Sequence, residues 1–290
     1  MARLVADVSV VVVTYRSRAT IGSCLESLDE PKPQSVTVVD NASDDGTASF
    51  VAERFPAVRV VELPANVGFG AAANVGIETA GTPYVVLLNP DARPVGDALA
   101  TLTRCAASRA DAAVVAPALV GDDGREQPSR VGYPSPFWTG GAAVTSFAAR
   151  RSRYGSEGFA VGAALLLDTR AFRDVGGFDP DFFLFYEEVD LCLRLEQAGR
   201  SIASCPDAVF RHAGGASTRL DWTESYRRQL AGHLRFVRKH RGPDAAERSR
   251  KVLVAAVGVR ALVERGQRRA AARAALPWLR GGGVAELLRN

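Results

Sequence analysis

Short apolar runs alternate with helix-like segments along the first part of the chain. Runs of β-branched and aliphatic residues predict five strands, at 8–14, 35–40, 58–63, 84–88 and 113–116. Apolar spacing between them predicts helices at 19–28, 46–54, 70–79 and 96–108. Because strands and helices alternate, we expect an α/β fold with a mostly parallel central sheet flanked by helices. Ligands bind beyond the carboxyl ends of the strands in such sheets.

The pattern changes in the second half of the chain. Residues 121–158 are rich in proline, glycine and aromatic residues, which predicts a long irregular insertion of functional importance or a surface excursion. Strands are then expected at 159–167 and 201–205, a helical turn at 171–175 and a helix at 187–197. The remaining residues predict two helices, at 222–240 and 245–276.

Charge divides the 290-residue chain into two parts. Residues 1–222 carry 20 Lys and Arg against 27 Asp and Glu, a balance of −7, whereas residues 223–290 carry 16 against 5, a balance of +11. We therefore predict a catalytic domain at 1–220 and a basic helical C-terminal extension at 221–290. Two interpretations of the extension stay open: peripheral contact with an anionic membrane surface, and solvated helices docked on the body. Nucleic acid is not expected, because the extension lacks a basic patch with interleaved aromatic residues.

Location follows from what the sequence contains. The first residues are interrupted by Asp7 and do not read as a signal peptide, and the late apolar run at 252–263 contains Arg260 and is too short to span a bilayer. The four cysteines are scattered, without a CxxC pair, as expected in a reducing compartment. These features predict a cytoplasmic protein, with membrane contact, if any, at the inner face of the cell membrane.

The most informative segment is the aromatic run 182–186 followed by Glu187, Glu188 and Asp190. Like charges this close repel one another, and apolar surroundings make ionised carboxylates costlier still. Such a cluster favours proton transfer or cation binding. The alternative is the solvated first turn of a helix, where acidic residues suit the positive end of the dipole.

Other polar residues follow predicted strands. Asp40 can accept hydrogen bonds from a base or ribose, or can simply cap the next helix. Asp91, in Asn89-Pro90-Asp91, can hold a divalent cation against two phosphates, or can belong to a proline turn. His212, beside Gly214 and Gly215, is a candidate metal or phosphate contact.

The segment 66–74 is rich in glycine and alanine, and small residues let a backbone approach a nucleotide closely. It lacks the GxGxxG pattern and an acidic residue at the dinucleotide offset, which argues against a Rossmann dehydrogenase.

Six motifs in this order resemble the family 2 glycosyltransferases, the inverting enzymes of GT-A (Rossmann-like) fold, over roughly residues 8–220. The motifs are Val8-Ser9-Val10-Val11-Val12-Val13-Thr14-Tyr15, Val39-Asp40-Asn41-Ala42-Ser43-Asp44-Asp45-Gly46-Thr47, Asn66-Val67-Gly68-Phe69, Leu88-Asn89-Pro90-Asp91, Gly176-Gly177-Phe178-Asp179 and Glu187-Glu188-Val189-Asp190-Leu191. The rhamnosyltransferase-like members are the most similar subgroup.

The resemblance implies a role for each matching position. The nucleotide-sugar site would comprise Thr14, Tyr15, Asp40, Asn66, Gly68, Asn89, Asp91 and Glu187. Asp91 matches the last acid of the DxD metal motif, whose first acid is replaced here by Asn89, and His212 would complete a Mg²⁺ or Mn²⁺ site. Glu188 falls at the general base, where the family often has Asp.

The implied activity is inverting transfer of a sugar, plausibly rhamnose, from a nucleotide-diphosphate donor to a hydroxyl of a cell-wall, lipid-linked or polysaccharide acceptor. The donor would be dTDP-rhamnose or a UDP or GDP sugar. Two alternatives stay open: a nucleotidyltransferase that makes a sugar nucleotide, and a non-catalytic nucleotide-sugar-binding scaffold. The first normally has a glycine-rich basic loop after the opening strand, which residues 14–18 do not provide.

Overall fold

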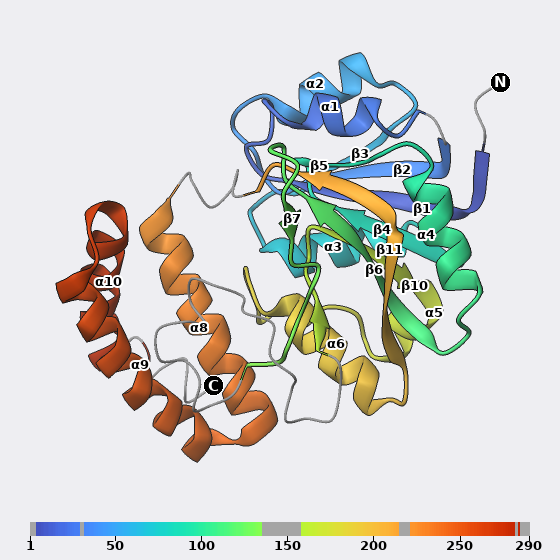
Figure 1. The fold of residues 1–290 in the computed structure, drawn as a ribbon. Helices are drawn as coiled ribbons and strands as arrows, with labels where there is room; N and C mark the ends of the chain where they lie inside the picture. The colour runs from blue at the N-terminus through green and yellow to red at the C-terminus, as the bar shows by residue number, and fades with distance from the viewer. Residues whose placement is uncertain (1–3, 30–31, 135–157, 215–220, 282–283, 285–290) are drawn as a thin grey trace.

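The computed structural model describes residues 4–29, 32–134, 158–214, 221–281 and 284, and its described strands form a large curled sheet covered by helices (Figure 1). The sheet has nine strands, in the order β3-β2-β1-β4-β10-β6-β11-β5, with β7 paired to β6. Its strands are β1 (Leu4–Thr14), β2 (Lys32–Asp40), β3 (Arg59–Glu62), β4 (Tyr84–Leu88), β5 (Ala92–Pro94), β6 (Ala112–Val120), β7 (Glu126–Gln127), β10 (Ala164–Asp168) and β11 (Ser201–His212). A separate two-stranded sheet pairs β8 (Arg130–Val131) with β9 (Phe159–Ala160).

Helices cover both faces of the sheet, and three more form a C-terminal group beside it (Figure 1). The helices of the body are α1 (Ile21–Glu26), α2 (Thr47–Arg54), α3 (Phe69–Glu78), α4 (Ala98–Ala107), α5 (Thr169–Asp174) and α6 (Glu187–Gln197). The C-terminal helices are α8 (Trp222–Arg241), α9 (Pro243–Val263) and α10 (Gly266–Arg280). Within the described residues, no helix has the length and hydropathy required to cross a bilayer.

The first half of the sheet is parallel. β1 pairs in parallel with β2 and β4, and β2 pairs in parallel with β3. Side chains of β1 alternate between two hydrophobic clusters: Val11 and Val13 face one side, and Val10 and Val12 the other. Burial on both faces is why this strand reads as a continuous β-branched run. The register places Thr14 opposite Asp40 at the carboxyl edge.

The second half of the sheet is mixed. β10 runs antiparallel to both β4 and β6, whereas β11 is parallel to β6. The short strand β5 pairs antiparallel with the end of β11, which sets Ala92 opposite His212. The ends of β4 and β11 are thereby brought to one edge of the sheet.

The predicted α/β class of fold is confirmed, but two predicted strands and one predicted helix have other bounds in the structure. The expected strand 159–167 is two strands, β9 and β10, in different sheets. The expected strand 201–205 continues to His212, because a register shift between Cys205 and Val209 accommodates Pro206 without ending the pairing. Most of the expected insertion 121–158 lies outside the described residues, and its described start contains β7 and β8.

The expected single helix 245–276 is in fact two helices. α9 ends at Val263, Glu264 and Arg265 adopt extended conformations, and α10 packs back against α9 and α8. Both helices contribute to one hydrophobic cluster, including Leu253, Val257, Ala272 and Leu279. The apolar periodicity therefore continues across the break between α9 and α10. For this reason the sequence pattern did not indicate that the helix ends at Val263.

Helix α8 joins the C-terminal group to the body. Asp221 caps its first turn by accepting a hydrogen bond from the backbone N–H of Glu224 at 2.9 Å. Leu230 and Leu234 lie in the cluster formed with α9 and α10, whereas Phe236 and Val237 lie in the core cluster of the body. The domain boundary at residue 220 stays a prediction drawn from charge. Helix α8 packs with one face against the body and with another against the C-terminal helices.

Candidate active site

Asp40 is buried and held by neighbouring residues at the carboxyl edge of β2. Its Oδ1 accepts hydrogen bonds from the hydroxyls of Thr14 and Ser43, at 2.8 and 2.6 Å, and its Oδ2 accepts one from the backbone N–H of Ser43 at 2.9 Å. Three donors fix the carboxylate and leave about one of its acceptor positions for another group. The contact with a nucleotide base stays a prediction, as does the role of Tyr15, whose ring lies 5.4 Å from the Arg16 guanidinium.

Asn41 was missed by the sequence analysis and links the first two loops. Its side-chain amide donates to Asn66 Oδ1 at 3.0 Å and to the carbonyl of Gly68 at 3.2 Å, and its Oδ1 accepts from the backbone N–H of Val67 at 2.9 Å. Asn66 Oδ1 in turn accepts the N–H of Gly68 at 3.1 Å. The predicted residues Asn66 and Gly68 are thus brought beside the Asp40 loop by a buried amide.

Gly68 makes the contact that brings the third segment to these loops. It has a φ of +92°, and a Cβ there would overlap the carbonyl oxygen of Phe183. The next residue, Phe69, donates its backbone N–H to that same oxygen at 2.8 Å. Glycine is required here both by its conformation and by the close approach. The segment before α6 therefore lies directly against the start of α3.

Glu187 and Glu188 form the first turn of α6, after two residues in the left-handed conformation. Phe185 and Tyr186 have φ values of 69° and 75°, which are unusual for non-glycine residues and mark a turn held by its surroundings. Burial raises the pKa of Glu187 well above its ordinary value, and the charge of Glu188 adds to this. Burial raises the pKa of Glu188 to about 7, against the opposing effect of backbone N–H groups including that of Gly162.

One carboxylate oxygen of each glutamate is buried and has no hydrogen-bond partner among the residues that the structure describes. Buried polar atoms are normally paired, so an unpaired Oε2 indicates a position that another group fills. A carboxyl group with a pKa near 7 can both accept and release a proton at neutral pH.

Gly162 and Ala163 connect Glu188 to the segment Asn89-Pro90-Asp91. The backbone N–H of Gly162 interacts with the Glu188 carboxylate, and the carbonyl of Ala163 accepts the N–H of Asn89 at 3.0 Å. A Cβ on Gly162 would lie 3.9 Å from Oε1 of Glu188. Two adjacent residues thus bring together motifs that lie far apart in the sequence.

Asp91 and His212 meet across the pairing of β5 with β11. Nε2 of His212 lies 3.5 Å from Oδ1 of Asp91, and both side chains are largely buried. The other ring nitrogen, Nδ1, lies 2.9 Å from Oε1 of Gln127, whose amide nitrogen donates to the carbonyl of His212 at 2.9 Å. The Gln127 oxygen can only accept, so the Nδ1–H of His212 donates to it, which leaves Nε2 facing the Asp91 carboxylate.

This arrangement fits a divalent cation. A carboxylate oxygen and an imidazole nitrogen 3.5 Å apart can both ligate a cation that lies between them. Oxygen and imidazole donors suit Mn²⁺, and Mg²⁺ commonly takes one or two protein ligands with phosphate oxygens and water. The described residues contain no cluster of three or more His, Cys, Asp or Glu side chains that could form a complete protein site.

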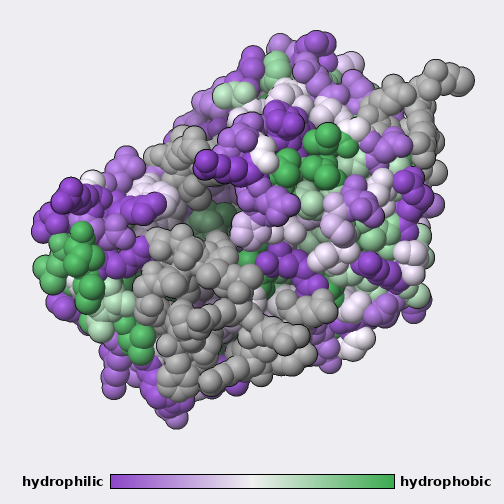
Figure 2. All heavy atoms as spheres, in the orientation of Figure 1, coloured by the Kyte–Doolittle hydropathy of each residue, from purple (hydrophilic) through white to green (hydrophobic). Residues whose placement is uncertain are grey.

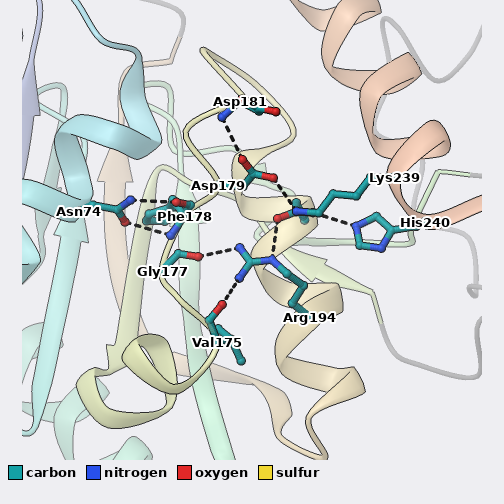
Figure 3. A network of polar contacts seen from close by, with 10 residues as sticks. Asn74, Val175, Gly177, Phe178, Asp179, Asp181, Arg194, Lys239 and His240 are labelled. Atoms are coloured by element: carbon teal, nitrogen blue, oxygen red, sulfur yellow. Dashed lines mark hydrogen bonds and ion pairs between the residues drawn. The ribbon is translucent and has the colours of Figure 1, made fainter. Parts of the chain in front are cut away.

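Asp190, the third carboxylate of the acidic cluster, belongs to a structural network of polar contacts, whose members Arg194, Lys239 and His240 are labelled in Figure 3. It is fully buried and contacts Arg194 at 2.7 Å, Lys239 at 2.8 Å and His240 at 2.8 Å. Arg194 also donates to the carbonyls of Val175 and Gly177, both at 2.6 Å. The network ties the 175–179 loop and α8 to the helix that carries the two glutamates.

Comparisons with known proteins agree with this geometry. Residues 9–176 match the family model described as glycosyl transferase family 2. The chain is 32% identical over 238 residues to the N-acetylglucosaminyl-diphospho-decaprenol L-rhamnosyltransferase of Mycobacterium tuberculosis, covering 73% of this chain and 78% of the relative. It is 27% identical over 239 residues to galactofuranosyltransferase GlfT1 of Mycolicibacterium smegmatis, covering 78% and 75%.

The fold also matches that of mannosyltransferase PcManGT from Pyrobaculum calidifontis, solved with GDP-Man and Mn²⁺. That likeness has a TM-score of 0.59 at 20% identity and covers 97% of this chain and 87% of the other. The family model spans more than half of the chain, and the mycobacterial relative is aligned over most of it. The chain is therefore a glycosyltransferase and belongs to glycosyl transferase family 2.

Proposed function

We propose that this enzyme transfers L-rhamnose, with inversion at the anomeric carbon, from a nucleotide-diphosphate donor to a hydroxyl of a lipid-linked diphosphate sugar. The name of the mycobacterial relative supports both the sugar and the acceptor class. The most important structural support is Glu188, whose buried unpaired oxygen and pKa of about 7 suit a general base.

Different residues of the chain bind the nucleotide and transfer the proton in the proposed reaction. Asn41, Asn66 and Gly68 shape the loop along the nucleotide. Glu188 accepts the proton of the acceptor hydroxyl as its oxygen attacks the anomeric carbon from the face opposite the leaving group. Burial and the charge of Glu188 raise the pKa of the neighbouring Glu187 carboxyl, which favours its neutral form beside an ionised Glu188.

Asp91 and His212 are the residues that would hold Mg²⁺ or Mn²⁺, with Gln127 orienting the imidazole. When bound there, a divalent cation neutralises the charge that develops on the leaving nucleoside diphosphate. Asp91 directly precedes β5 and His212 ends β11, and these two strands are paired, so the separation of the two side chains is set before the donor arrives.

The test is a transfer assay with dTDP-rhamnose and a polyprenyl-diphosphate N-acetylglucosamine acceptor, comparing the wild-type chain with Glu188→Gln. We expect Glu188→Gln to lower kcat by about 10²- to 10⁴-fold while the affinity for dTDP changes little. The control is Glu196→Gln, on the same helix but outside its first turn. Donor binding without transfer by the wild-type protein would instead support a scaffold, and pyrophosphate release from dTTP and rhamnose 1-phosphate would support a nucleotidyltransferase.

We also propose that the C-terminal helices hold the enzyme at an anionic membrane surface, where a lipid-linked acceptor resides. Val259, Leu262 and Val263 are 58%, 73% and 68% exposed near the end of α9, and Arg265 and Arg268 follow them on the surface. Figure 2 shows hydrophobic spheres gathered on the outer surface of these helices. Apolar side chains flanked by arginines match an anionic lipid interface.

Vesicle flotation tests this contact. Leu262→Glu with Val263→Glu should reduce binding to phosphatidylglycerol vesicles by at least tenfold and leave the weak binding to phosphatidylcholine vesicles unchanged. Val95→Glu, which places the same charge at a 44% exposed valine of the body, is the matched control. Equal flotation of all three proteins would refute membrane contact at this surface.

A further inference from the structure

Helix α8 lies along the whole segment that precedes and begins α6. On one helical face, Arg228 stacks 4.2 Å from the ring centroid of Phe183, and Phe236 lies 6.0 Å from that of Tyr186. Further along that face, Lys239 and His240 contact Asp190. Arg228, Phe236 and His240 are multiples of four residues apart and so lie on one face of α8, where they meet residues 183, 186 and 190 in that order.

The closest approach is at the two left-handed residues. A Cβ on Gly232 would lie 2.8 Å from the carbonyl oxygen of Phe185 and 3.0 Å from Cδ2 of Tyr186. The absence of a side chain at Gly232 therefore lets the backbone of α8 pack directly against the turn. A residue with positive φ is kept in that state only when its surroundings specify it, and α8 provides those surroundings.

A buried chain of hydrogen bonds fixes the ring of Tyr186. Its hydroxyl lies 3.1 Å from Nδ1 of His233, and Nε2 of that histidine lies 2.8 Å from the hydroxyl of Ser249 on α9. Both His233 and Ser249 are buried. Burial lowers the pKa of His233 to about 3, so the imidazole stays neutral and each ring nitrogen keeps one role, donor or acceptor.

Tyr186 is the residue from which α6 starts. Its carbonyl accepts the N–H of Asp190 at 2.9 Å, and its backbone N–H contributes to the interactions of the Glu188 carboxylate. The orientation of Tyr186 therefore determines the direction of the first turn of α6, and this turn carries Glu188.

We infer that Tyr186 and His233 are positioning residues for the reaction: the C-terminal helices, through the Tyr186–His233–Ser249 chain, hold the turn that aims the Glu188 carboxylate. The inference rests on the proposed role of Glu188 as base. It gives the basic extension a part in catalysis separate from any contact with a membrane.

The experiment compares full-length Tyr186→Phe and His233→Leu with the wild type in the transfer assay. Each change removes the hydrogen bond and keeps an apolar group of similar size. We expect kcat to fall about tenfold, with KM for the donor within about twofold, because a misaimed base impairs the chemical step rather than donor binding. His233→Asn, which can still bond to the Tyr186 hydroxyl, should recover most of the activity.

Tyr226→Phe is the matched control. Tyr226 lies on the same helix, and its hydroxyl accepts from Arg260 at 3.4 Å within the C-terminal group. This variant loses a comparable buried hydrogen bond without touching the turn, so its kcat should equal that of the wild type. Equal kcat values in Tyr186→Phe and Tyr226→Phe would overturn the inference.

A ¹³C NMR titration of labelled glutamate carboxyls separates this inference from the proposed function, because it needs no turnover. The Glu188 signal is assigned by its loss in Glu188→Gln. The charge of Glu188 raises the pKa of Tyr186, Glu187 and Cys192, so these titratable groups are coupled to it. Tyr186→Phe should loosen the turn before α6 and so move backbone N–H donors away from the Glu188 carboxylate. Because those donors lower its pKa, the apparent pKa of Glu188 should rise in Tyr186→Phe and stay unchanged in Tyr226→Phe. An unchanged titration refutes the inference, whereas an inactive wild type with a shifted titration refutes only the proposed reaction.

Discussion

Nε2 of His212 lies 3.5 Å from Oδ1 of Asp91, across the pairing of β5 with β11. Gln127 engages the opposite ring nitrogen and the backbone carbonyl of the same histidine. The two potential ligands are therefore fixed in separation by the strands and in orientation by a third side chain. Such outer partners fix the orientation of a ligating imidazole, and their loss typically lowers metal affinity by about 10- to 100-fold.

Gln127→Leu should weaken the binding of Mn²⁺ in the presence of dTDP by about 10- to 100-fold, because the imidazole of His212 loses the partner that fixes its orientation. Isothermal titration calorimetry or the EPR signal of free Mn²⁺ measures the change. Gln197→Leu, at an exposed position at the end of α6, provides the control. Unaltered Mn²⁺ affinity in Gln127→Leu would show that His212 needs no such support.

The rate of transfer should depend on pH through Glu188. Burial raises the pKa of this carboxyl to about 7, and the base acts only when deprotonated. We expect kcat to fall about tenfold per pH unit below pH 7 and to level off above it. A raised carboxyl pKa also means that the folded state binds this proton more tightly than the unfolded chain. Its contribution to stability is therefore present at low pH and is lost as the pH rises through 7.

A kcat that stays constant from pH 5 to pH 8 would contradict the assignment of the base. Glu188→Gln provides the internal control for stability: its melting temperature should decline less between pH 5 and pH 8 than that of the wild type, since of the two glutamates only Glu187 then contributes.

Asp190→Asn should destabilise the fold by about 3–5 kcal/mol, because Arg194 and Lys239 would lose a buried counter-ion. Burial acts to raise the pKa of Asp190, but hydrogen bonds from His240 and Lys239 and the charge of Arg194 outweigh it and lower that pKa to about 2. The contribution to stability is therefore present at pH values above about 4 and is lost as the pH falls through 2.

Urea unfolding at pH 7 and at pH 3 measures this effect. Asp174→Asn provides a control at an exposed ion pair, where Arg170 lies 4.0 Å away and both side chains are largely solvated. That substitution should leave stability unchanged. Equal unfolding midpoints for Asp190→Asn and Asp174→Asn at pH 7 would contradict the role of the network.

Two glycines in C-terminal helices should respond in opposite ways to substitution by alanine. At Gly232 the added Cβ would meet the backbone of Phe185, which should destabilise the protein by about 1–3 kcal/mol and lower kcat. At Gly258, within α9, a Cβ meets no atom within 4 Å, so the higher helix propensity of alanine should stabilise by about 0.5–1 kcal/mol. Thermal unfolding of both variants measures the contrast, and stabilisation by Gly232→Ala would contradict it.

Much of the fold could be predicted from local patterns. The strand of Val10 to Val13 is buried on both faces, and its uniform apolar run reflects that directly. By contrast, β5 has three residues and exists only because the end of β11 pairs with it. The turn between α9 and α10 was hidden because both helices bury residues in the same cluster. Tertiary contacts decide such elements, and they leave little trace in a sequence window.

The site could be predicted in part, residue by residue. Asp91, His212 and Glu188 stand out as polar residues after strands or behind an apolar run. Asn41 lies next to Asp40 in one of the six motifs but was not predicted as a site residue. Its buried amide holds the loop of Asn66 and Val67. Gln127 gave no signal, since an isolated glutamine in a proline-rich stretch resembles any surface residue. The structure reveals it through its paired contacts with His212.

The contact between α8 and the turn at Tyr186 bears on how the protein is made. A ribosome adds α8 only after every strand of the central sheet has been synthesised. A nascent chain that has just completed β11 can pair its strands, but it still lacks Gly232 and His233. These two residues pack against the turn at Phe185 and Tyr186 and hold its conformation. The enzyme should therefore acquire its activity late in its own biosynthesis, when the residues through Ser249 have left the exit tunnel.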